Sequence, residues 1–261
     1  MNSSFSIDSG LKGKSALVVG GSGGIGSALS LALARCGVDL TLHGGHESEK
    51  FDSLLQEIFE ISGMRPKKIV ENLLESPFDS LESSPLAESA RKCDILCLCF
   101  GPFVQKSLHE TNLSDWKKLS LLDYALPGFL LSSALPAMMK NHFGRILLFG
   151  GSGTSHRLEF STNAAYAGAK SGLNVLVSST AASYADYGIT CNAICPGFVE
   201  TEYLPESVKR ELSAKMPLES MISLPSIAET ALFLLQNADI NGTIVRLDRG
   251  WSPSQKSMKF C

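Results

Sequence analysis

The stretch Val19-Gly20-Gly21-Ser22-Gly23-Gly24-Ile25-Gly26 places five glycines within eight residues. The apolar run Ser15–Val19 precedes it and is typical of a buried parallel strand. Residues 25–35 follow with helical character and end at Gly37, a common residue at a helix C-terminus. Glycines between a strand and a helix let backbone N–H groups approach a phosphate, and the helix N-terminus favours its charge. The stretch therefore predicts a phosphate-binding loop, with a simple tight turn as the alternative.

The spacing of these glycines narrows the class of phosphate site. It reads Gly20-x-x-x-Gly24-x-Gly26, which differs from the Gly-x-Gly-x-x-Gly pattern of many dinucleotide sites. No Lys-Ser or Lys-Thr pair closes the loop, as it would in a P-loop. This argues against hydrolysis of ATP or GTP.

Strands and helices alternate through the rest of the chain. Further strands are expected at residues 40–42, 68–70, 94–99, 145–149, 189–194 and 243–247. Further helices are expected at residues 47–62, 81–92, 114–140 (bent or split by Pro127 and Pro136), 164–184 and 225–236. Repeated β-α-β units predict one α/β domain over residues 1–261, a doubly wound, Rossmann-like parallel sheet of about seven strands with helices on both faces. Ligands of such sheets bind at the carboxyl ends of the strands.

Composition excludes several classes of protein. The chain has 261 residues, of which 44% are hydrophobic and 19% charged, and its formal net charge is −3. This predicts a folded protein rather than collagen or a disordered chain, and without the basic excess that binds nucleic acid or anionic lipid. Residues 1–10 do not resemble a secretory signal, and no apolar run reaches the about 18 residues of a membrane span. We therefore expect a cytoplasmic protein that does not bind a membrane.

Seven cysteines are present, an odd number. Cys97-Leu98-Cys99 has no second pair or histidines nearby in sequence, so no metal site is predicted. We interpret the cysteines as small core residues in a reducing compartment, while a redox role for the terminal Cys261 stays open.

Tyr166 and Lys170 open the helix expected at residues 164–184. Their i, i+4 spacing puts both side chains on one helix face. A tyrosine has an ordinary pKa of about 10, and a nearby ammonium would lower it towards the range useful for proton transfer. The pair thus indicates acid–base chemistry, although such a pair also arises by chance in any helix.

Together these motifs resemble the short-chain dehydrogenase/reductase family. The glycine loop is preceded by Leu11-x-Gly-Lys-x-Ala-Leu-Val in that family's manner, and Tyr166-x-x-x-Lys170 is its catalytic spacing. The segment Asn192-Ala-Ile-Cys-Pro-Gly-Phe-Val-Glu-Thr201 resembles the one that contacts nicotinamide, and residues 217–235 and 242–250 resemble the family's last helix and strand. The resemblance covers nearly the whole chain. Within the family, the overall sequence most resembles the 3-oxoacyl-carrier-protein reductases.

The resemblance implies roles for individual residues. Tyr166 is the expected proton donor to a substrate carbonyl oxygen, and Lys170 is expected to lower its pKa and bind the nicotinamide ribose. The expected catalytic residues are Tyr166, Lys170, Ser152 and Asp123. The expected cofactor-binding residues are Gly20, Ser22, Gly24, Ile25, His43, Gly44, Gly101, Tyr166, Lys170, Pro196, Gly197, Val199 and Thr201.

Departures from the family cluster around this expected site. Val19 replaces a threonine, and Leu98-Cys-Phe-Gly101 keeps only the glycine of an Asn-Asn-Ala-Gly turn. Asp123 stands where the family has an asparagine that helps to anchor a water. An ungapped match puts Gly151 at the position of the catalytic serine, so we assign that role to the next residue, Ser152. A loop serine that bonds to its own backbone is the alternative.

Cofactor preference depends on the sequence after the second strand, Leu42-His-Gly-Gly-His46. It has neither the acid that would bind the adenine ribose hydroxyls nor an arginine for a 2′-phosphate. His43 and His46 are candidates for partial positive charge, with ordinary surface loop residues as the alternative. We favour NADP without excluding NAD.

Two functions remain after these observations. The first is an NADP-dependent oxidoreductase that interconverts a ketone and a secondary alcohol, with residues 202–216 as an amphipathic lid helix over a small-molecule substrate. The second is a non-catalytic relative that binds the cofactor for regulation, suggested by Asp123 and the missing serine. A homodimer or homotetramer packed through residues 114–140 and 164–184 is expected in either case.

Overall fold

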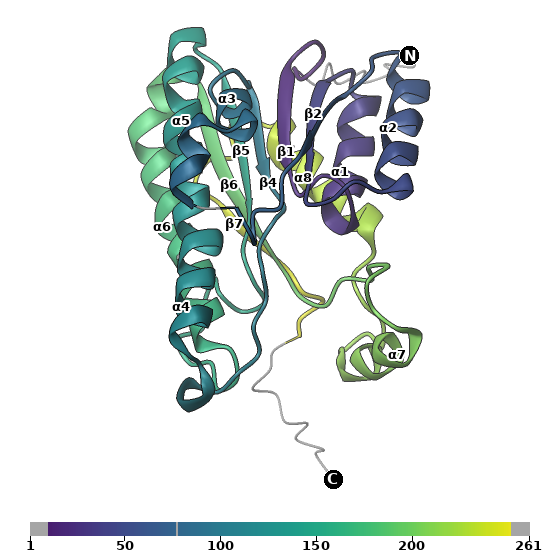
Figure 1. Ribbon diagram of the computed structural model, residues 1–261, viewed down its shortest axis with the longest axis vertical. Helices are drawn as coiled ribbons and strands as arrows, with labels where there is room; N and C mark the ends of the chain where they lie inside the picture. Colours follow the sequence, from purple (N-terminus) through teal and green to yellow (C-terminus); the bar gives the residue numbers. More distant parts are fainter. Residues whose placement is uncertain (1–9, 77, 252–261) are drawn as a thin grey trace, which may run out of the picture.

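A computed structural model of the chain describes residues 10–76 and 78–251. Its centre is a sheet of seven parallel strands in the order β3-β2-β1-β4-β5-β6-β7 (Figure 1). The strands are β1 (Ser15–Val19), β2 (Asp39–Gly44), β3 (Lys67–Val70), β4 (Ile95–Leu98), β5 (Gly144–Phe149), β6 (Ile189–Pro196) and β7 (Ile244–Leu247). The expected doubly wound α/β fold is confirmed.

Helices cover both faces of the sheet. They are α1 (Gly24–Arg35), α2 (Glu49–Ser62), α3 (Pro85–Ala90), α4 (Leu113–Ser120), α5 (Leu126–Asn141), α6 (Ala164–Tyr184), α7 (Glu206–Lys215) and α8 (Leu224–Gln236), with short helical turns η1 (Phe78–Ser83), η2 (Leu108–Glu110), η3 (Leu121–Ala125) and η4 (Ala185–Tyr187). Figure 1 shows α1, α2 and α8 on one side of the sheet, and α4, α5 and α6 on the other. Helix α7 stands apart from both layers, below the sheet in that view.

The central strands are apolar because both of their faces are covered. Along β1, Leu17 and Val19 enter the core beneath α5 and α6, whereas Ala16 and Val18 enter the core beneath α1 and α8. This alternation follows from the two-residue period of a strand. The whole strand is therefore fixed from both sides, and its carboxyl end holds the glycine loop in place.

The long helix expected at residues 114–140 is interrupted by a π-helical turn. Helix α4 ends at Ser120, η3 is a π-helix over Leu121–Ala125, and α5 begins at Leu126. Pro127 lies in the first turn of α5 and has no N–H, so the carbonyl of Asp123 cannot receive an α-helical hydrogen bond from it. Pro136 lies within α5. The break therefore comes before Pro127, at the turn that carries Asp123.

Among the residues that the structure describes, the stretch Leu113–Asn141 is long and apolar enough to cross a membrane by those two criteria. Half of its most apolar window is buried within the fold. Leu122, Leu126 and Leu130 belong to the core under the sheet. These buried leucines thus pack as those of a core helix do.

Two other expected helices are shorter than the sequence indicates. Residues 81–92 form the end of η1 followed by the six-residue α3, which Ser84 caps through its side chain. The expected lid helix over residues 202–216 begins only at Glu206, because Pro205 at its N-cap has an extended backbone. Residues 201–205 therefore form a separate segment before α7.

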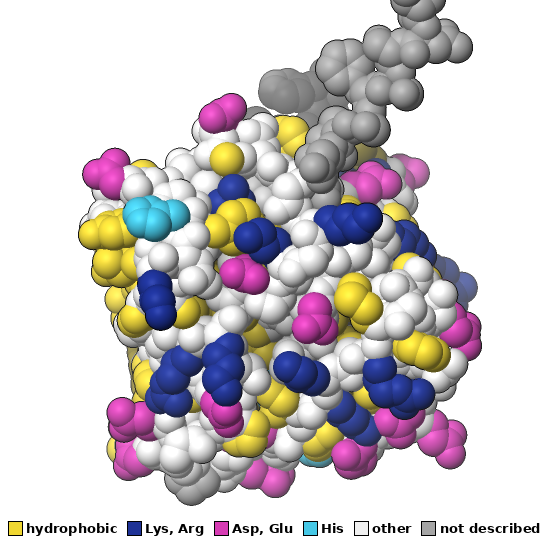
Figure 2. Space-filling model, turned by 90° about the horizontal axis from the view of Figure 1, so that it is seen from above, with side chains coloured by type: hydrophobic (Ala, Val, Ile, Leu, Met, Phe, Trp, Pro, Cys, Tyr) yellow, Lys and Arg dark blue, Asp and Glu magenta, His cyan; other side chains and the backbone are white. Residues whose placement is uncertain are grey.

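Charged side chains of both signs are mixed on the surface. On the face shown in Figure 2, lysines and arginines are interspersed with aspartates and glutamates. A mixture of this kind produces no strong field of one sign on that face.

The sheet order brings four loops to one edge. Strands β1 and β4 are neighbours although β2 and β3 lie between them in sequence, so the strand order reverses between them. The glycine loop follows β1, the segment ending in Gly101 follows β4, the loop at Gly150 follows β5 and Gly197 follows β6. This is the carboxyl edge, where ligands of doubly wound sheets bind.

Candidate active site

The glycine loop is closely packed against the start of α1. A side chain at Gly26 would place its Cβ 2.0 Å from the carbonyl oxygen of Gly20, so only glycine fits there. Gly20 has a φ of +74° and Gly24 a φ of +52°, in the left-handed region that favours glycine. The loop therefore needs glycine at Gly26 because the backbone of Gly20 is too close for a side chain. It favours glycine at Gly20 and Gly24 because their backbone is left-handed.

His43 holds the loop from beneath. The Gly20 N–H donates to His43 Nδ1 at 3.2 Å, and Nε2 lies 2.9 Å from the carbonyl oxygen of Glu71. Since Nδ1 accepts, we assign the proton to Nε2, which donates to Glu71. Burial lowers the pKa of His43 and keeps the ring neutral. His43, which was expected to provide positive charge near the adenosine, thus points inward and bonds to backbone atoms.

Gly44, the last residue of β2, lies under the same loop. A Cβ there would lie 2.8 Å from the ring of Phe51 and 2.9 Å from the side chain of Ser22. Ser22 and Gly44 are therefore brought together, as expected of two residues that bind one ligand.

An acidic side chain occupies the start of α1. The Gly24 N–H donates to Glu202 Oε1 at 2.9 Å, and Lys50 Nζ donates to the same oxygen. The loop thus already binds an anionic group, which is the chemistry that a pyrophosphate requires. A dinucleotide cofactor fits these donors. Glu202 and Lys50 lie outside the motifs recognised in the sequence, although Glu202 directly follows Thr201.

Lys170 lies at the bottom of the site and has two oxygen partners. Its Nζ donates to the carbonyl oxygen of Phe149 at 3.1 Å and lies 3.2 Å from Asp123 Oδ1. Burial raises the pKa of Asp123 to about 6, against the opposing effect of the Lys170 charge. Gly101 covers this pair, since a Cβ there would lie 2.2 Å from Asp123 Oδ1. Three of the expected site residues therefore touch one another.

Tyr166 is in the first turn of α6, next to this pair. The ring of Phe103 meets its ring edge to face, with centroids 4.9 Å apart. Burial raises the pKa of Tyr166, and the charges of Asp123 and Cys195 act in the same direction. The lowered pKa expected from Lys170 is not found in this structure. The main physical reason is burial of the Tyr166 hydroxyl, to which the negative charge of Asp123 adds.

The loop after β5 brings Gly151 against the tyrosine. A Cβ at Gly151 would lie 2.9 Å from the hydroxyl of Tyr166 and 2.8 Å from its ring. Thr154 fixes this loop: its Oγ1 donates to the Gly151 carbonyl oxygen at 2.9 Å and accepts from the Gly151 N–H at 3.0 Å. Ser152 Oγ is buried and has no hydrogen-bond partner among the described residues. It does not bond to its own backbone.

The segment after β6 lies alongside the glycine loop. Pro196 ends the strand, the Gly197 N–H donates to the Leu247 carbonyl oxygen at 3.0 Å, and Val199 pairs with Ile222. The methyl group of Thr201 would lie 3.6 Å from a Cβ at Gly24. The residues expected at the two ends of a nicotinamide cofactor are therefore placed along one edge.

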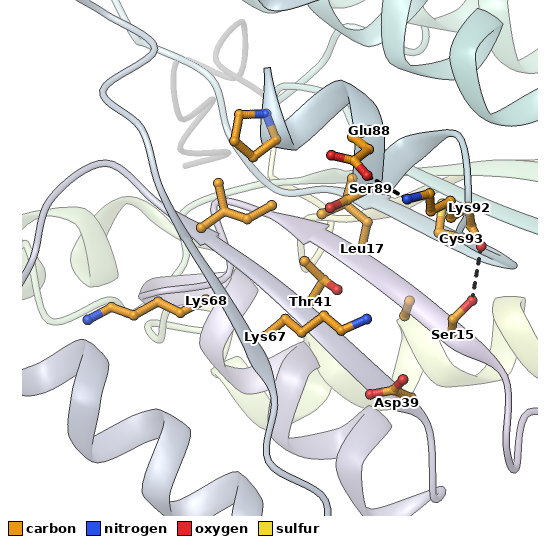
Figure 3. Close-up of a pocket in the computed structure, with 13 residues that line it drawn as sticks. Ser15, Leu17, Asp39, Thr41, Lys67, Lys68, Glu88, Ser89, Lys92 and Cys93 are labelled. Carbon is orange, nitrogen blue, oxygen red and sulfur yellow. Dashed lines mark hydrogen bonds and ion pairs between the residues drawn. The ribbon is translucent and has the colours of Figure 1, made fainter. Parts of the chain in front are cut away.

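Two further features lie outside this edge. A cavity of about 550 Å³ is lined by Ser15, Asp39 and Lys67, at the amino ends of their strands, and by Lys92 and Glu88 near α3 (Figure 3). The carboxyl edge is at the opposite end of these strands. Within residues 10–76 and 78–251, no group of three or more His, Cys, Asp or Glu side chains is arranged to hold a metal, and the six cysteines there are free. Cys261 lies outside the described residues.

Comparison with known proteins agrees with this geometry. The family model described as enoyl-(acyl carrier protein) reductase matches residues 20–252. The chain is 26% identical to D-β-hydroxybutyrate dehydrogenase of Rhizobium meliloti and 26% identical to 3-oxoacyl-[acyl-carrier-protein] reductase of Aquifex aeolicus. Each of these two alignments covers 92% of this chain and 98% of the relative.

Solved structures are similar over the same extent. The crystal structure of a 3-oxoacyl (acyl-carrier-protein) reductase from Agrobacterium tumefaciens with NADP bound superposes with a TM-score of 0.80 at 26% identity, covering 92% of this chain and 95% of the other. A short-chain dehydrogenase/reductase from Serratia marcescens has a TM-score of 0.79 at 25% identity, covering 92% of this chain and 98% of the other. The similarity thus extends over nearly the whole of both chains.

Proposed function

The chain belongs to the short-chain dehydrogenase/reductase family, and from this we propose that it is an NADP(H)-dependent oxidoreductase that interconverts a ketone and a secondary alcohol. The observation that carries the proposal is the cluster of Tyr166, Lys170 and Gly101 at the carboxyl edge, beside a glycine loop that binds an anionic group. The family consists of oxidoreductases that use a nicotinamide cofactor.

The chemical roles divide between the cofactor and the protein. When bound, the nicotinamide supplies or accepts the hydride. The Tyr166 hydroxyl donates its proton to the carbonyl oxygen in reduction and accepts a proton from the alcohol in oxidation. Lys170, which is held by the Phe149 carbonyl oxygen, stabilises the phenolate that proton donation leaves behind. Ser152 supplies a hydroxyl to the substrate oxygen, which its buried and unpaired Oγ supports.

Cofactor binding is assigned to the loops at the carboxyl edge. Gly20, Ser22, Gly24 and Ile25 hold the pyrophosphate at the start of α1. Gly44 borders the adenosine end, and His43 acts there by holding Gly20. The nicotinamide end is assigned to Gly101, Pro196, Gly197, Val199 and Thr201.

The preference for NADP rests on the end of β2, where no acid follows Leu42 before Glu47 to repel a 2′-phosphate. The NADP bound to the Agrobacterium relative supports the same choice. Dissociation constants for NADPH and NADH decide it. Tighter binding of NADH would contradict the preference.

Replacement of Tyr166 by phenylalanine tests the catalytic assignment. Tyr166→Phe is expected to abolish turnover of the ketones that the wild type reduces, while NADPH binding is unchanged, because only the proton-donating hydroxyl is lost. Tyr184→Phe, near the other end of α6, is the matched control and should keep full activity. Undiminished turnover by Tyr166→Phe would contradict the role.

A second function is supported by a different observation. The Asp123–Lys170 ion pair and the raised pKa of Tyr166 both disfavour the phenolate. This is what a family member that binds the cofactor without catalysing a reaction would be expected to show. Such a protein would act as a cofactor sensor. Turnover of any ketone or diketone from a broad panel with NADPH would exclude it.

The remaining features of the proposal concern partners and location. We assign the whole chain to one domain that acts on a small carbonyl or alcohol in the cytoplasm, as a homodimer or homotetramer. The relatives include a hydroxybutyrate dehydrogenase and 3-oxoacyl reductases, so the compounds to try first are short 3-oxo acids and their thioesters.

A further inference from the structure

The N–H at the start of α1 is bonded to a side chain from a distant part of the sequence. Glu202 Oε1 accepts from the Gly24 N–H at 2.9 Å, and Lys50 Nζ bonds to the same oxygen. Lys50 belongs to the first turn of α2, whereas Glu202 follows β6. Three separate elements therefore meet at a single carboxylate oxygen.

The neighbouring tyrosine completes this contact. The Tyr203 hydroxyl would lie 1.8 Å from a Cβ at Gly23, so it rests directly on the glycine loop. Lys50 Nζ lies 5.3 Å from the centroid of the Tyr203 ring. Residues 201–203 thus lie over the loop where the proposed pyrophosphate site is exposed to its ligand.

Glu202 is ionised in this position. Although burial acts to raise its pKa, the bonds from Lys50 and from the Gly24 N–H outweigh it, and the pKa of Glu202 is lowered. A cofactor phosphate carries the same sign of charge and uses the same two kinds of donor, a helix N-terminal amide and an ammonium. The carboxylate and a phosphate therefore compete for one place.

Lys50 is the lysine of α2 that is able to change partners. Its side chain is 55% exposed, and Glu202 is its ion-pair partner. Lys68, on the neighbouring strand β3, is held by two carboxylates, those of Glu47 and Asp52. Release of Glu202 leaves the Lys50 ammonium beside the Gly24 amide.

We propose that Lys50 binds the pyrophosphate of the cofactor and that Glu202 holds this place in the absence of cofactor. The inference rests on the cofactor binding proposed above. On binding, the Gly24 N–H and Lys50 exchange the Glu202 carboxylate for phosphate oxygens, and the side chains of Glu202 and Tyr203 leave the loop. Glu202 then acts as a built-in competitor that weakens cofactor binding.

Fluorescence titration of the full-length protein with NADPH and with NADH tests both parts. Glu202→Gln keeps the shape but removes the charge, and it is expected to tighten both cofactors by about tenfold, because a charged hydrogen bond no longer has to be broken. Lys50→Gln in the Glu202→Gln background is expected to weaken both by about tenfold. The effect of Lys50 should diminish at high salt.

Glu211→Gln is the matched control, since it removes one charge from an exposed ion pair with Lys215 on α7. Tightening by Glu202→Gln and not by Glu211→Gln supports the competitor role. If the wild type binds cofactor and Glu202→Gln binds it no better than Glu211→Gln, the inference is wrong and the proposed function stands. If neither the wild type nor Glu202→Gln binds NADPH or NADH, the proposed function fails as well.

Two results would contradict the proposed role of Lys50. If Lys50 served only to hold Glu202, Lys50→Gln would tighten binding in the wild-type background and change nothing in the Glu202→Gln background. A loss confined to NADPH would overturn the assignment to the pyrophosphate, because the two cofactors share that group. Equal weakening of both supports it.

Discussion

Asp123 and Lys170 form a buried ion pair, with Oδ1 and Nζ 3.2 Å apart and side chains that are 0% and 6% exposed. The aspartate arises from the π-helical turn before Pro127, and the lysine from α6. Because the pair is largely removed from water, the carboxylate cancels much of the field that Lys170 exerts on Tyr166. Asp123 therefore adds to burial in making Tyr166 harder to deprotonate.

The first prediction concerns the ionisation of Tyr166. Asp123→Asn removes a negative charge that raises the pKa of Tyr166, so this pKa should fall by about one unit or more. Tyrosinate absorbance during an alkaline titration measures it, and subtraction of Tyr166→Phe identifies the signal. Asp186→Asn, in the exposed turn η4, is the control. An unchanged titration in Asp123→Asn would contradict the electrostatic role.

The same substitution has a consequence for catalysis. In the oxidation direction Tyr166 accepts a proton, so the pH at which kcat/KM reaches half of its maximum should move lower in Asp123→Asn by a similar amount. A movement to higher pH would show that Asp123 assists the phenolate instead.

The second prediction concerns Ser152, whose buried Oγ has no partner among the described residues. Ser152→Ala is expected to lower kcat by about 100-fold, since one hydrogen bond to the reacting oxygen is lost, and to leave the NADPH dissociation constant unchanged. Ser155→Ala is the control, because Ser155 Oγ bonds to the exposed His156. Equal kcat values for the two variants would remove Ser152 from the mechanism.

Local sequence was enough to predict the sheet and part of the site. The glycine loop, the strand before it and the Tyr166–Lys170 helix are each determined by residues within one turn or one strand, and all three were expected. The parallel direction of the strands follows from the β-α-β connections. Features that depend on the residues of a single strand, helix or turn could therefore be predicted from the sequence.

Contacts between distant elements could not be predicted in this way. The place of Glu202 depends on Lys50 of α2 and Gly24 of α1. Glu202 is more than a hundred residues from either of them in the sequence. The inward orientation of His43 depends on the carbonyl group of Glu71 after β3. His43 was expected as a source of positive charge near the cofactor, whereas Glu202 and Lys50 had been given no role. These contacts form only when distant strands, helices and loops come together in the folded chain.

The third prediction uses the pKa of His43. Burial lowers this pKa below its ordinary value of 6.5, so the unfolded chain takes up a proton before the folded protein does. The contribution of neutral His43 to the free energy of unfolding is therefore complete above about pH 7 and is lost as the pH falls below about 6.5. Denaturant unfolding at about pH 7.5 and about pH 5 measures it.

His43→Gln is the variant to compare, since glutamine does not titrate. At about pH 7.5 it should be less stable than the wild type by about 1–3 kcal/mol, because the bonds to Gly20 and Glu71 are weakened, and this difference should shrink at about pH 5. His46→Gln, a substitution in the exposed loop after β2, should show no such trend. A constant difference across the two pH values would mean that His43 has the same pKa in the folded and the unfolded protein, and it would contradict the prediction.

The fourth prediction concerns the proposed oligomer. Trp116 on α4, Tyr124 on η3 and Val175 on α6 are 41%, 41% and 61% exposed, and Tyr124 packs over Gly172 of α6. Exposed apolar residues gathered on adjoining helices are typical of an interface between subunits.

Light scattering should give a dimer or tetramer for the wild type. Val175→Lys should lower the mass, since it places a charge in the interface, whereas Leu74→Lys, at a position that is 51% exposed in the loop after β3, should not. A wild-type monomer would contradict the prediction, and an unchanged mass in Val175→Lys would place the interface on other helices.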